Sequence, residues 1–504
     1  MIPRLLLAAF LVCAVLPAAQ NAPNPLDQAE VSIRVRDGRW VDREVTRFAA
    51  AYGGDLVAMR SELARVLYRS RSFDGIDLGR PSVIAWRKGR SPLIVVIPIS
   101  DRGKFLDSFG VVDAGEPPLV RVGERDGTVI YRQNQPGGEW EYRLLVAANT
   151  AFLTRSVEEC RQLATSVGSL VAEPFGAPVE ATLRGSGLLN PHIPGTDWMS
   201  ALPALPIDLA EINKVPGLLP QAWQDLSSQV AAITLTAQSG AQGDLRLTAR
   251  LTAKPETPLA GWIPTQRPSA ERLAGQLRSP ATALLISGRL SFQGQFERWA
   301  FEQADTLRTA AAARWNETAD GAFRGLCTLL ERCGAWSLSV ERSGPGLLQL
   351  WAVEHPRAVE VVQYVATIVG VLQGVEPDTA RVLDRDATSL AVPGGTSILV
   401  AGDRHAVRLD DRGAKRALAA AGEAVKRLET TGGLDAEPAL VSLWMDLALA
   451  WNAPIPAEQE RADPVIVRAA LRPAGAASLE FIADLPIARL GVLLGRLNKI
   501  LRND

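Results

Sequence analysis

Arg143-Leu-Leu-Val-Ala-Ala-Asn-Thr-Ala-Phe-Leu-Thr-Arg-Ser156 has a counterpart further along the chain, Ser397-Ile-Leu-Val-Ala-Gly-Asp-Arg-His-Ala-Val-Arg-Leu-Asp410, at an offset of 254 residues (399 − 145). Two further strand-like segments recur at offsets of 255 (337 − 82) and 253 (284 − 31). Similarity at a nearly constant spacing is the signature of a repeated structural unit. The sequence therefore predicts two tandem copies of one module.

The modules are predicted to cover residues 31–262 and 281–504, with residues 264–280 as the linker between them. Strands near Val179 and Val441 differ by 262 positions, whereas the closing hairpins, near Leu245 and Leu479, differ by only 234. The first module therefore contains about 28 additional residues (262 − 234), which we place within 191–229. This Pro- and Leu-rich insertion is expected to cover a sheet edge or to add a role specific to that copy.

Hydrophobic periodicity predicts the same early order of elements in both modules. Alternation of apolar and polar residues indicates strands, and apolar residues three and four apart indicate helices. The elements expected at the start of the first module are Val31–Arg36, Trp40–Ala51, Asp55–Tyr68, Ser82–Trp86, Pro92–Ile99 and the helix from Asp101 to Phe109. The order βαββαβ is that of ferredoxin-like folds. We expect an α+β protein with antiparallel sheets, a ferredoxin-like start and extra hairpins.

The N-terminus has the pattern of an export signal. Arg4 precedes an apolar run, Leu5–Leu16, which ends at Pro17-Ala-Ala-Gln20. This pattern predicts a secretory signal peptide over residues 1–20 and a periplasmic or secreted mature protein. The best later candidate for a membrane span, Val361–Leu372, is too short, so no transmembrane segment is expected after cleavage.

Charge excludes one class of partner. The chain has a net charge of −1 and 22% charged residues, which argues against a dedicated nucleic-acid-binding protein. Arginine is in local excess between Val31 and Arg90. Such a region either contacts anionic lipid head groups or an acidic partner, or is an ordinary solvated face.

Three cysteines remain after signal cleavage: Cys160, Cys327 and Cys333. An oxidising compartment allows a disulfide between Cys327 and Cys333. Six residues along a continuous helix span ~9 Å, which exceeds the ~7 Å that a disulfide can bridge between Cα atoms. The bond therefore requires the helix to end between them, and Gly334 is a suitable stop. The alternative is that both are buried thiols.

Motifs for catalysis or metal binding are missing from the sequence. The three histidines, His192, His355 and His405, lie far apart, and none belongs to a zinc-binding pattern. We expect His355 to cap the helix that follows Pro356, and His405 to be an ordinary core or surface residue. No catalytic, cofactor-binding or metal-binding residue is predicted, and no cofactor.

Pairs of acidic residues occur, but their spacing is poor for acid–base catalysis. Neighbouring residues point in different directions on a helix or a strand. The pairs are Glu158 with Glu159, Asp410 with Asp411, and Glu458 with Glu460. Asp410 and Asp411 are predicted to lie at the start of a helix, where they would cap it. The tryptophans, among them Trp86, Trp336 and Trp351, are expected to pack in the core rather than to form stacking platforms.

The run Ile97-Pro-Ile-Ser-Asp-Arg-Gly-Lys-Phe-Leu106 and the closing hairpin segment Gly243–Pro255, behind a signal peptide, resemble large exported bacterial proteins of unknown function built from a duplicated α+β module. The resemblance implies no activity. We expect an exported, non-enzymatic binding or structural protein of the bacterial envelope or exterior, with an envelope or extracellular protein or an apolar ligand as partner. The alternatives are a secreted hydrolase with a carboxylate-based site and a periplasmic lipid carrier.

Overall fold

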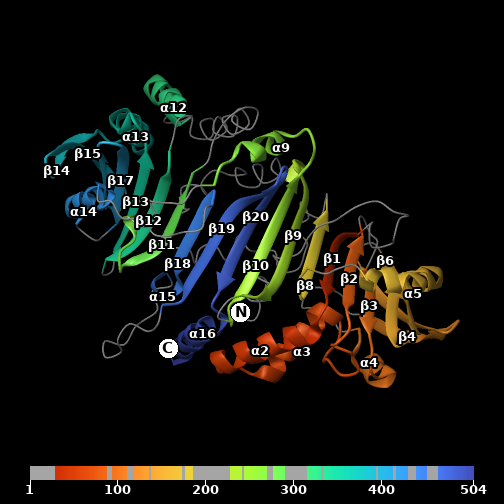
Figure 1. Cartoon of the computed structure of the whole chain (residues 1–504). Helices are drawn as coiled ribbons and strands as arrows, with labels where there is room; N and C mark the ends of the chain where they lie inside the picture. Colours follow the sequence, from red (N-terminus) through yellow and green to blue (C-terminus); the bar gives the residue numbers. More distant parts are fainter. Residues whose placement is uncertain are drawn as a thin grey trace. The chain divides into compact units, whose positions relative to one another are not determined.

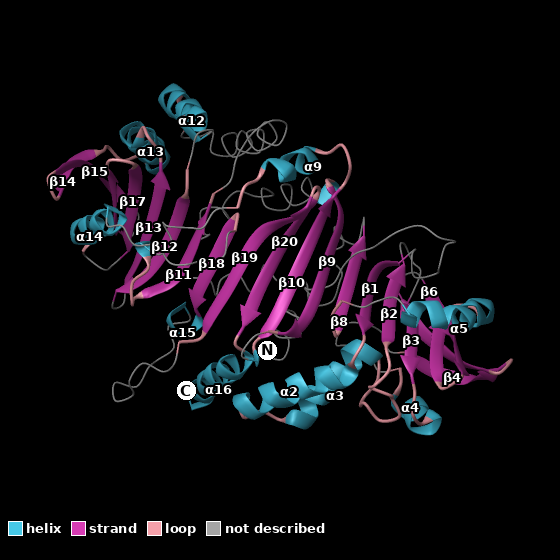
Figure 2. Ribbon diagram, in the orientation of Figure 1, coloured by secondary structure: helices cyan, strands magenta, loops and turns pink. Residues whose placement is uncertain are grey.

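A computed structural model gives the fold of the chain as a mixture of helices with a large antiparallel sheet (Figure 2). Ten α-helices are formed by the described residues. The structure describes residues 29–87, 93–110, 119–135, 138–172, 176–184, 227–240, 243–268, 276–289, 315–330, 334–343, 346–392, 395–412, 416–429, 439–450 and 464–503. The predicted signal peptide, most of the 191–229 insertion, His192, Cys333, Glu458 and Glu460 lie outside these residues.

The chain forms two compact units (Figure 1). The first comprises Met1–Ala201, Val230–Thr252 and Asp484–Asp504, and the second comprises Leu202–Gln229 and Ala253–Ala483. The predicted modules were contiguous, whereas these units are not. The difference arises because the last helix, α16 (Ile487–Asn503), packs on the N-terminal helix α2 (Gly38–Tyr52) of the first unit.

In the first unit the strands lie in the order β10-β9-β8-β1-β2-β3-β7-β6-β5-β4, and the pairings with known register are antiparallel. Their bounds are β1 Ala29–Val35, β2 Ser82–Arg87, β3 Leu93–Pro98, β4 Val120–Arg125, β5 Thr128–Gln135, β6 Gly138–Ala147, β7 Thr150–Thr154, β8 Val179–Arg184, β9 Val230–Ser239 and β10 Leu245–Ala253. A ferredoxin-like start requires parallel strands on either side of a third. Here β1 instead pairs directly and antiparallel with β2, with Ile33 opposite Ile84, so that start is not seen.

In the second unit the order is β20-β19-β18-β11-β12-β13-β17-β16-β15-β14, and its pairings with known register are antiparallel as well. The bounds are β11 Thr282–Gly288, β12 Trp336–Ser343, β13 Gly346–Glu354, β14 Asp378–Val382, β15 Arg385–Val392, β16 Gly395–Ala401, β17 His405–Arg412, β18 Val441–Asp446, β19 Ile466–Gly475 and β20 Ser478–Leu485.

Aspartates begin three helices of the first unit, as the sequence predicted for Asp101. Asp37 precedes α2, Asp55 precedes α3 (Leu56–Tyr68), and Asp101 precedes α4 (Arg102–Ser108). Each carboxylate accepts hydrogen bonds from backbone N–H groups of the first turn, which have no partner within the helix. These caps fix where each helix starts.

In the sheet of the first unit, both faces of β3 are buried: successive residues of Ile94–Ile97 point to opposite faces, and all of them are buried. On one face α5 (Val157–Ala172) packs its Leu163 on Ile94, Val96 and Phe152. Aromatic rings contribute to a second cluster that includes α4, where Phe109 meets Tyr131 edge to face with ring centroids 5.4 Å apart.

In the second unit, helices cover both faces of the sheet. Helix α14 (Ala417–Glu429) packs on one face, against the row that includes Leu350, Leu409 and Ile398. Helix α13 (Ala358–Gln373) packs on the other, against Leu390 and Leu399. The remaining described helices are α9 Pro258–Trp262, α12 Glu317–Leu330 and α15 Leu447–Ala450, with a short 3₁₀ turn at Ile263–Thr265. Across the described helices, none is both long and apolar enough to cross a membrane.

Candidate functional site

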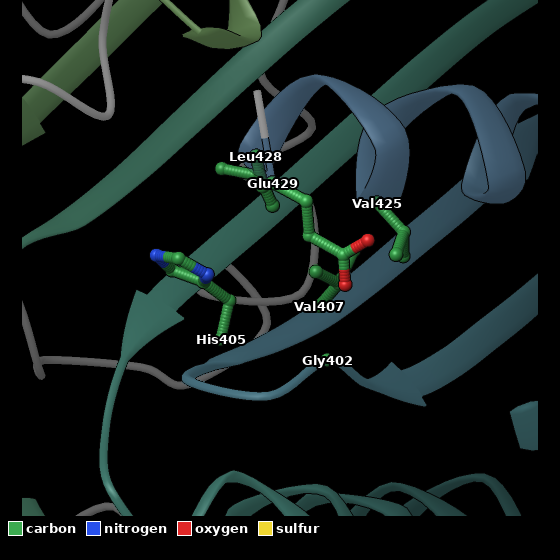
Figure 3. A pocket seen from close by; sticks show the side chains of 6 residues that line it. All are labelled: Gly402, His405, Val407, Val425, Leu428 and Glu429. Carbon is green, nitrogen blue, oxygen red and sulfur yellow. The ribbon is translucent and has the colours of Figure 1, made fainter. Parts of the chain in front are cut away.

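A small hollow lies at the end of the second unit where β16 turns into β17 (Figure 3). The turn is tight, because the N–H of Gly402 donates to the carbonyl oxygen of His405 over 2.8 Å. The hollow is shallow and leaves no room for a water molecule, and it is lined by Gly402, His405, Val407, Val425, Leu428 and Glu429. It therefore combines an imidazole and a carboxylate with three aliphatic side chains.

Ion pairs surround this hollow. Arg385 of β15 places Nη1 2.9 Å from Oδ1 of Asp403 and Nη2 2.6 Å from Oε1 of Glu429. In the turn between β16 and β17, Arg404 lies 3.0 Å from Oε1 of Glu354 of β13. Each carboxylate is thus held by an arginine, and neither glutamate is left as an unpaired base.

His405 is half-buried at this end of the sheet, directly opposite Glu354 of β13. Burial lowers the pKa of His405, and the charge of Arg404 adds to that effect, while Glu354 and Glu429 act in the other direction. The neutral imidazole is therefore the main form at neutral pH.

The hollow is too small for an organic substrate. Sites for small molecules usually have volumes of ~300 to 1,000 Å³, whereas this hollow leaves no room even for a water molecule. A metal site is also unsupported, because the described residues contain no group of three or more His, Cys, Asp or Glu side chains placed to hold an ion. What this arrangement can do chemically is exchange a proton at His405 and shift the ion pairs around it.

His355 has the capping role that the sequence predicted. Its ring is buried, and Nδ1 accepts a hydrogen bond from the N–H of Arg357, at 2.9 Å, where α13 begins. Because Nδ1 accepts, Nε2 carries the proton and donates to the carbonyl oxygen of Leu329 at the end of α12, at 3.0 Å. The ring therefore links the ends of two helices and has no free nitrogen for chemistry.

The prediction for Asp410 and Asp411 was wrong in its secondary structure. Both residues lie in strand β17 and both are buried. Asp410 is held by Arg408 of the same strand, with both oxygens 3.0 Å from the guanidinium. Asp411, which points to the other face of the sheet, accepts from the N–H of Arg416 just before α14, at 2.7 Å. The expected capping is therefore present at Asp411, but it comes from a strand.

Two further buried acids are also bound by neighbouring groups. Glu341 of β12 lies 3.1 Å from Arg427 of α14, which ties the helix to the sheet. Asp446 accepts from the N–H groups of Ala448 and Leu449 at the start of α15. Neither residue was predicted from the sequence, since a single acid within a strand has no local signature.

The cysteines show no sign of a reactive site. Cys160 is buried, its thiol donates to the carbonyl oxygens of Arg143 and Phe152, and burial raises its pKa. Cys327 is half-buried on α12, which ends at Leu330. Cys333 lies outside the described residues, so the bond stays a prediction.

One tryptophan departs from the expected core packing. Trp351 of β13 has 41% of its surface exposed. Trp336 is only half-buried, Trp262 is buried, and the side chain of Trp86 lies outside the description.

No family model matches this chain, and no curated protein and no solved structure matches it. The case for a function therefore depends on the contacts that its own side chains make.

Proposed function

We propose that the chain is an exported, non-enzymatic protein that binds or supports a partner at the bacterial envelope or exterior. The observation that carries this proposal is the use of the buried acidic side chains. Asp411, Glu341 and Asp446 each bind a helix or the start of one, and Asp410 binds Arg408 of its own strand. Catalytic carboxylates more often lie in environments that shift their pKa toward the value that the reaction needs.

The geometry gives little support to a hydrolase. A carboxylate pair that cleaves glycosidic bonds faces one substrate from two sides of a cleft, at roughly 5 to 9.5 Å. Asp410 and Asp411 instead point to opposite faces of one sheet. A lipid carrier needs a roomy apolar cavity, whereas the apolar residues beneath α14 form a packed cluster.

We also propose that the two units arose by duplication of one module. The strand orders of the two units support this position by position. They are β8-β1-β2-β3-β7-β6-β5-β4 in the first unit and β18-β11-β12-β13-β17-β16-β15-β14 in the second. The offsets near 254 residues in the sequence support it as well. Helix α16 would then be an addition that follows the second copy.

Export is proposed from the N-terminal sequence alone. Arg4, the apolar run Leu5–Leu16 and the small residues behind it are typical of a signal peptide. Fractionation of an expressing bacterium, followed by N-terminal sequencing, tests this part. A mature protein beginning between Gln20 and Pro23 is expected, and an intact Met1 in the cytoplasm would contradict it.

A stability series tests the non-enzymatic role. Asp410→Asn, Glu341→Gln and Asp446→Ala should each lower the free energy of unfolding by about 1 to 3 kcal/mol. The first two remove the charge that pairs an arginine, and the third removes the acceptor of two backbone N–H groups. Asp386→Asn is the matched control: this carboxylate is 88% exposed, so its removal should change stability by less than ~0.5 kcal/mol.

An enzyme would give a different result in this series. Replacing a catalytic residue commonly raises stability, since active sites are built at a cost in stability. A variant of Asp410, Glu341 or Asp446 that unfolds at a higher temperature than the parent, and that loses a hydrolytic activity which the parent shows, would overturn the proposal.

A further inference from the structure

The sheet of the second unit has an exposed pair of side chains on the face where α13 packs. They lie on β13 and β17, and β13 is an interior strand with β12 on its other side (Figure 2). Trp351 of β13 is directly opposite Arg408 of β17, so both side chains are on the same face. Trp351 is 41% exposed, and the side chain of Arg408 is 31% exposed. Tryptophan is among the most buried residues on average, so this exposure on an interior strand is unusual.

Buried leucines flank this pair on both sides. Leu399 of β16 is opposite Arg408 and belongs to the cluster beneath α13. Leu338 of β12 is opposite Trp351 and belongs to a separate cluster on the same face. The exposed pair therefore lies between two packed apolar clusters, not at an edge of the sheet.

A row of buried polar side chains lies beside the pair. Asp410, Gln349 and Ser397 are paired across β17, β13 and β16 on the same face as Trp351, and each is at most 7% exposed. Asp410 holds Arg408 through both carboxylate oxygens. Within the described part of the chain, Nε2 of Gln349 and Oγ of Ser397 have no hydrogen-bond partner. Buried polar groups are nearly always paired, so two such groups in one row indicate a place that water or a ligand completes.

The first unit has apolar residues at the corresponding place. Strands β3 and β7 hold the positions of β13 and β17 in the strand order. Their pairs Val95 with Leu153 and Val96 with Phe152 are at most 3% exposed. An apolar core is thus compatible with this arrangement of strands, and the polar row of the second unit is not a requirement of the fold. Departures of this kind are typical of functional sites.

The chemistry of this surface restricts the ligand. The charges of Arg408 and Asp410 cancel, so the pair does not select an ionic ligand. A purely apolar ligand would cover the N–H groups of Arg408 without pairing them, at a cost in free energy. The indole ring of Trp351, in contrast, requires an apolar surface to pack on. A neutral ligand with an apolar face and with hydroxyl groups along its edges meets all three conditions, and sugar rings have this structure.

We infer that Trp351, Arg408 and Gln349 bind a neutral glycan chain. A sugar ring stacks its C–H face on the indole of Trp351, whose ring face carries partial negative charge. The guanidinium of Arg408, fixed by Asp410, donates to sugar hydroxyls through the N–H groups that Asp410 does not take. The amide nitrogen of Gln349 has no hydrogen bond to break, so it turns outward to bind a further hydroxyl. The inference rests on the proposed binding role and gives its partner a chemical class.

Isothermal titration calorimetry of the full chain with chitohexaose and with cellohexaose, two neutral linear glycans, tests this inference. At least one should bind, and its affinity should change by less than about twofold between low and high NaCl, since no net charge is neutralised. Trp351→Ala should weaken binding by about tenfold or more. Binding of neither glycan, as expected for a site that takes a polypeptide, would overturn the inference. An affinity that falls steeply with salt would overturn it as well.

Phe481→Ala is the matched control. Phe481 of β20 is 42% exposed, much as Trp351 is, but it lies outside the polar row. Its loss should leave the affinity within about twofold of that of the parent. Equal losses in Phe481→Ala and Trp351→Ala would show that any exposed aromatic ring has this effect, and the inference would then be wrong.

Gln349→Leu separates binding from folding. The change removes an unpaired buried amide, so stability should stay the same or rise, while the affinity for the glycan should fall about fivefold. A merely structural amide would give the reverse, a loss of stability with unchanged affinity, and that result would overturn the inference. The same variant decides the question if Trp351→Ala does not fold, as judged by circular dichroism. If no glycan binds while the carboxylate variants behave as described above, the proposed function stands with a different partner.

Discussion

Gly495 of α16 lies against the carbonyl oxygen of Tyr52, at the end of α2, so closely that a Cβ at Gly495 would stand 2.4 Å from that oxygen. Gly491, one turn earlier, meets Ala51 in the same way. Closely packed interiors accommodate added atoms only by moving the surrounding elements apart. The two glycines therefore set how near the C-terminal helix comes to α2.

Gly495→Ala should destabilise the protein by about 1 to 3 kcal/mol, since the new methyl group forces α16 away from α2. Gly321→Ala is the matched control, because Gly321 lies within helix α12 and has no atom within 4 Å of the added Cβ. That change should stabilise the protein by up to about 1 kcal/mol through helix propensity. Urea unfolding followed by circular dichroism measures both, and a stabilised Gly495→Ala protein would disprove the close contact.

The variants Tyr131→Phe and Tyr142→Phe should differ in stability, although the two tyrosines lie opposite each other on the paired strands β5 and β6. Burial raises the pKa of Tyr131 to about 12, and its hydroxyl has no hydrogen-bond partner. Removing that hydroxyl should leave stability unchanged or slightly higher. The hydroxyl of Tyr142 donates to Oε1 of Gln133 at 3.2 Å, and its removal should cost about 1 kcal/mol. Thermal unfolding distinguishes the pair, and a larger loss at Tyr131 would contradict this reading.

Local patterns were sufficient to predict most elements of the fold. Alternation at Val31–Val35 and the N-cap at Asp101 are properties of a few neighbouring residues, and both elements form as expected. The pairing of β1 with β2 and the docking of α16 on α2 could not be read in this way. They depend on contacts between residues far apart in the chain, and the order βαββαβ is compatible with several pairings.

The candidate site was harder to predict than the fold. His355 was placed correctly because it precedes Pro356, and that dipeptide favours a helix start. The cluster around His405 joins Arg385, Asp403 and Glu429 from separate elements, so it has no signature in the sequence. Asp411 was assigned to the wrong element because a buried acid on a strand can cap a helix that begins six residues later.

His355→Ala should lower the free energy of unfolding by about 2 to 4 kcal/mol. The change removes both hydrogen bonds of a buried ring and leaves a cavity between α12 and α13. His355→Asn keeps an acceptor near the N–H of Arg357 and should recover about 1 kcal/mol of the loss. Equal stability of the two variants in urea unfolding would show that the cap contributes nothing.

Acidification should destabilise the native state through His405. Burial lowers the pKa of His405 below its usual value of 6.5, so the unfolded chain takes up a proton in a range where the folded chain does not. The stability linked to this group is therefore fully present above pH 6.5 and is lost as the pH falls through the folded pKa. His405→Gln removes that dependence. The difference in Tm between the parent and this variant (parent minus variant) should therefore decrease as the pH is lowered from 7.5 to 5. Glu429→Gln should lower the pKa of His405 further, because Glu429 favours the imidazolium. Titration of the imidazole signal by NMR measures both effects, and a midpoint at or above 6.5 in the parent would refute the prediction.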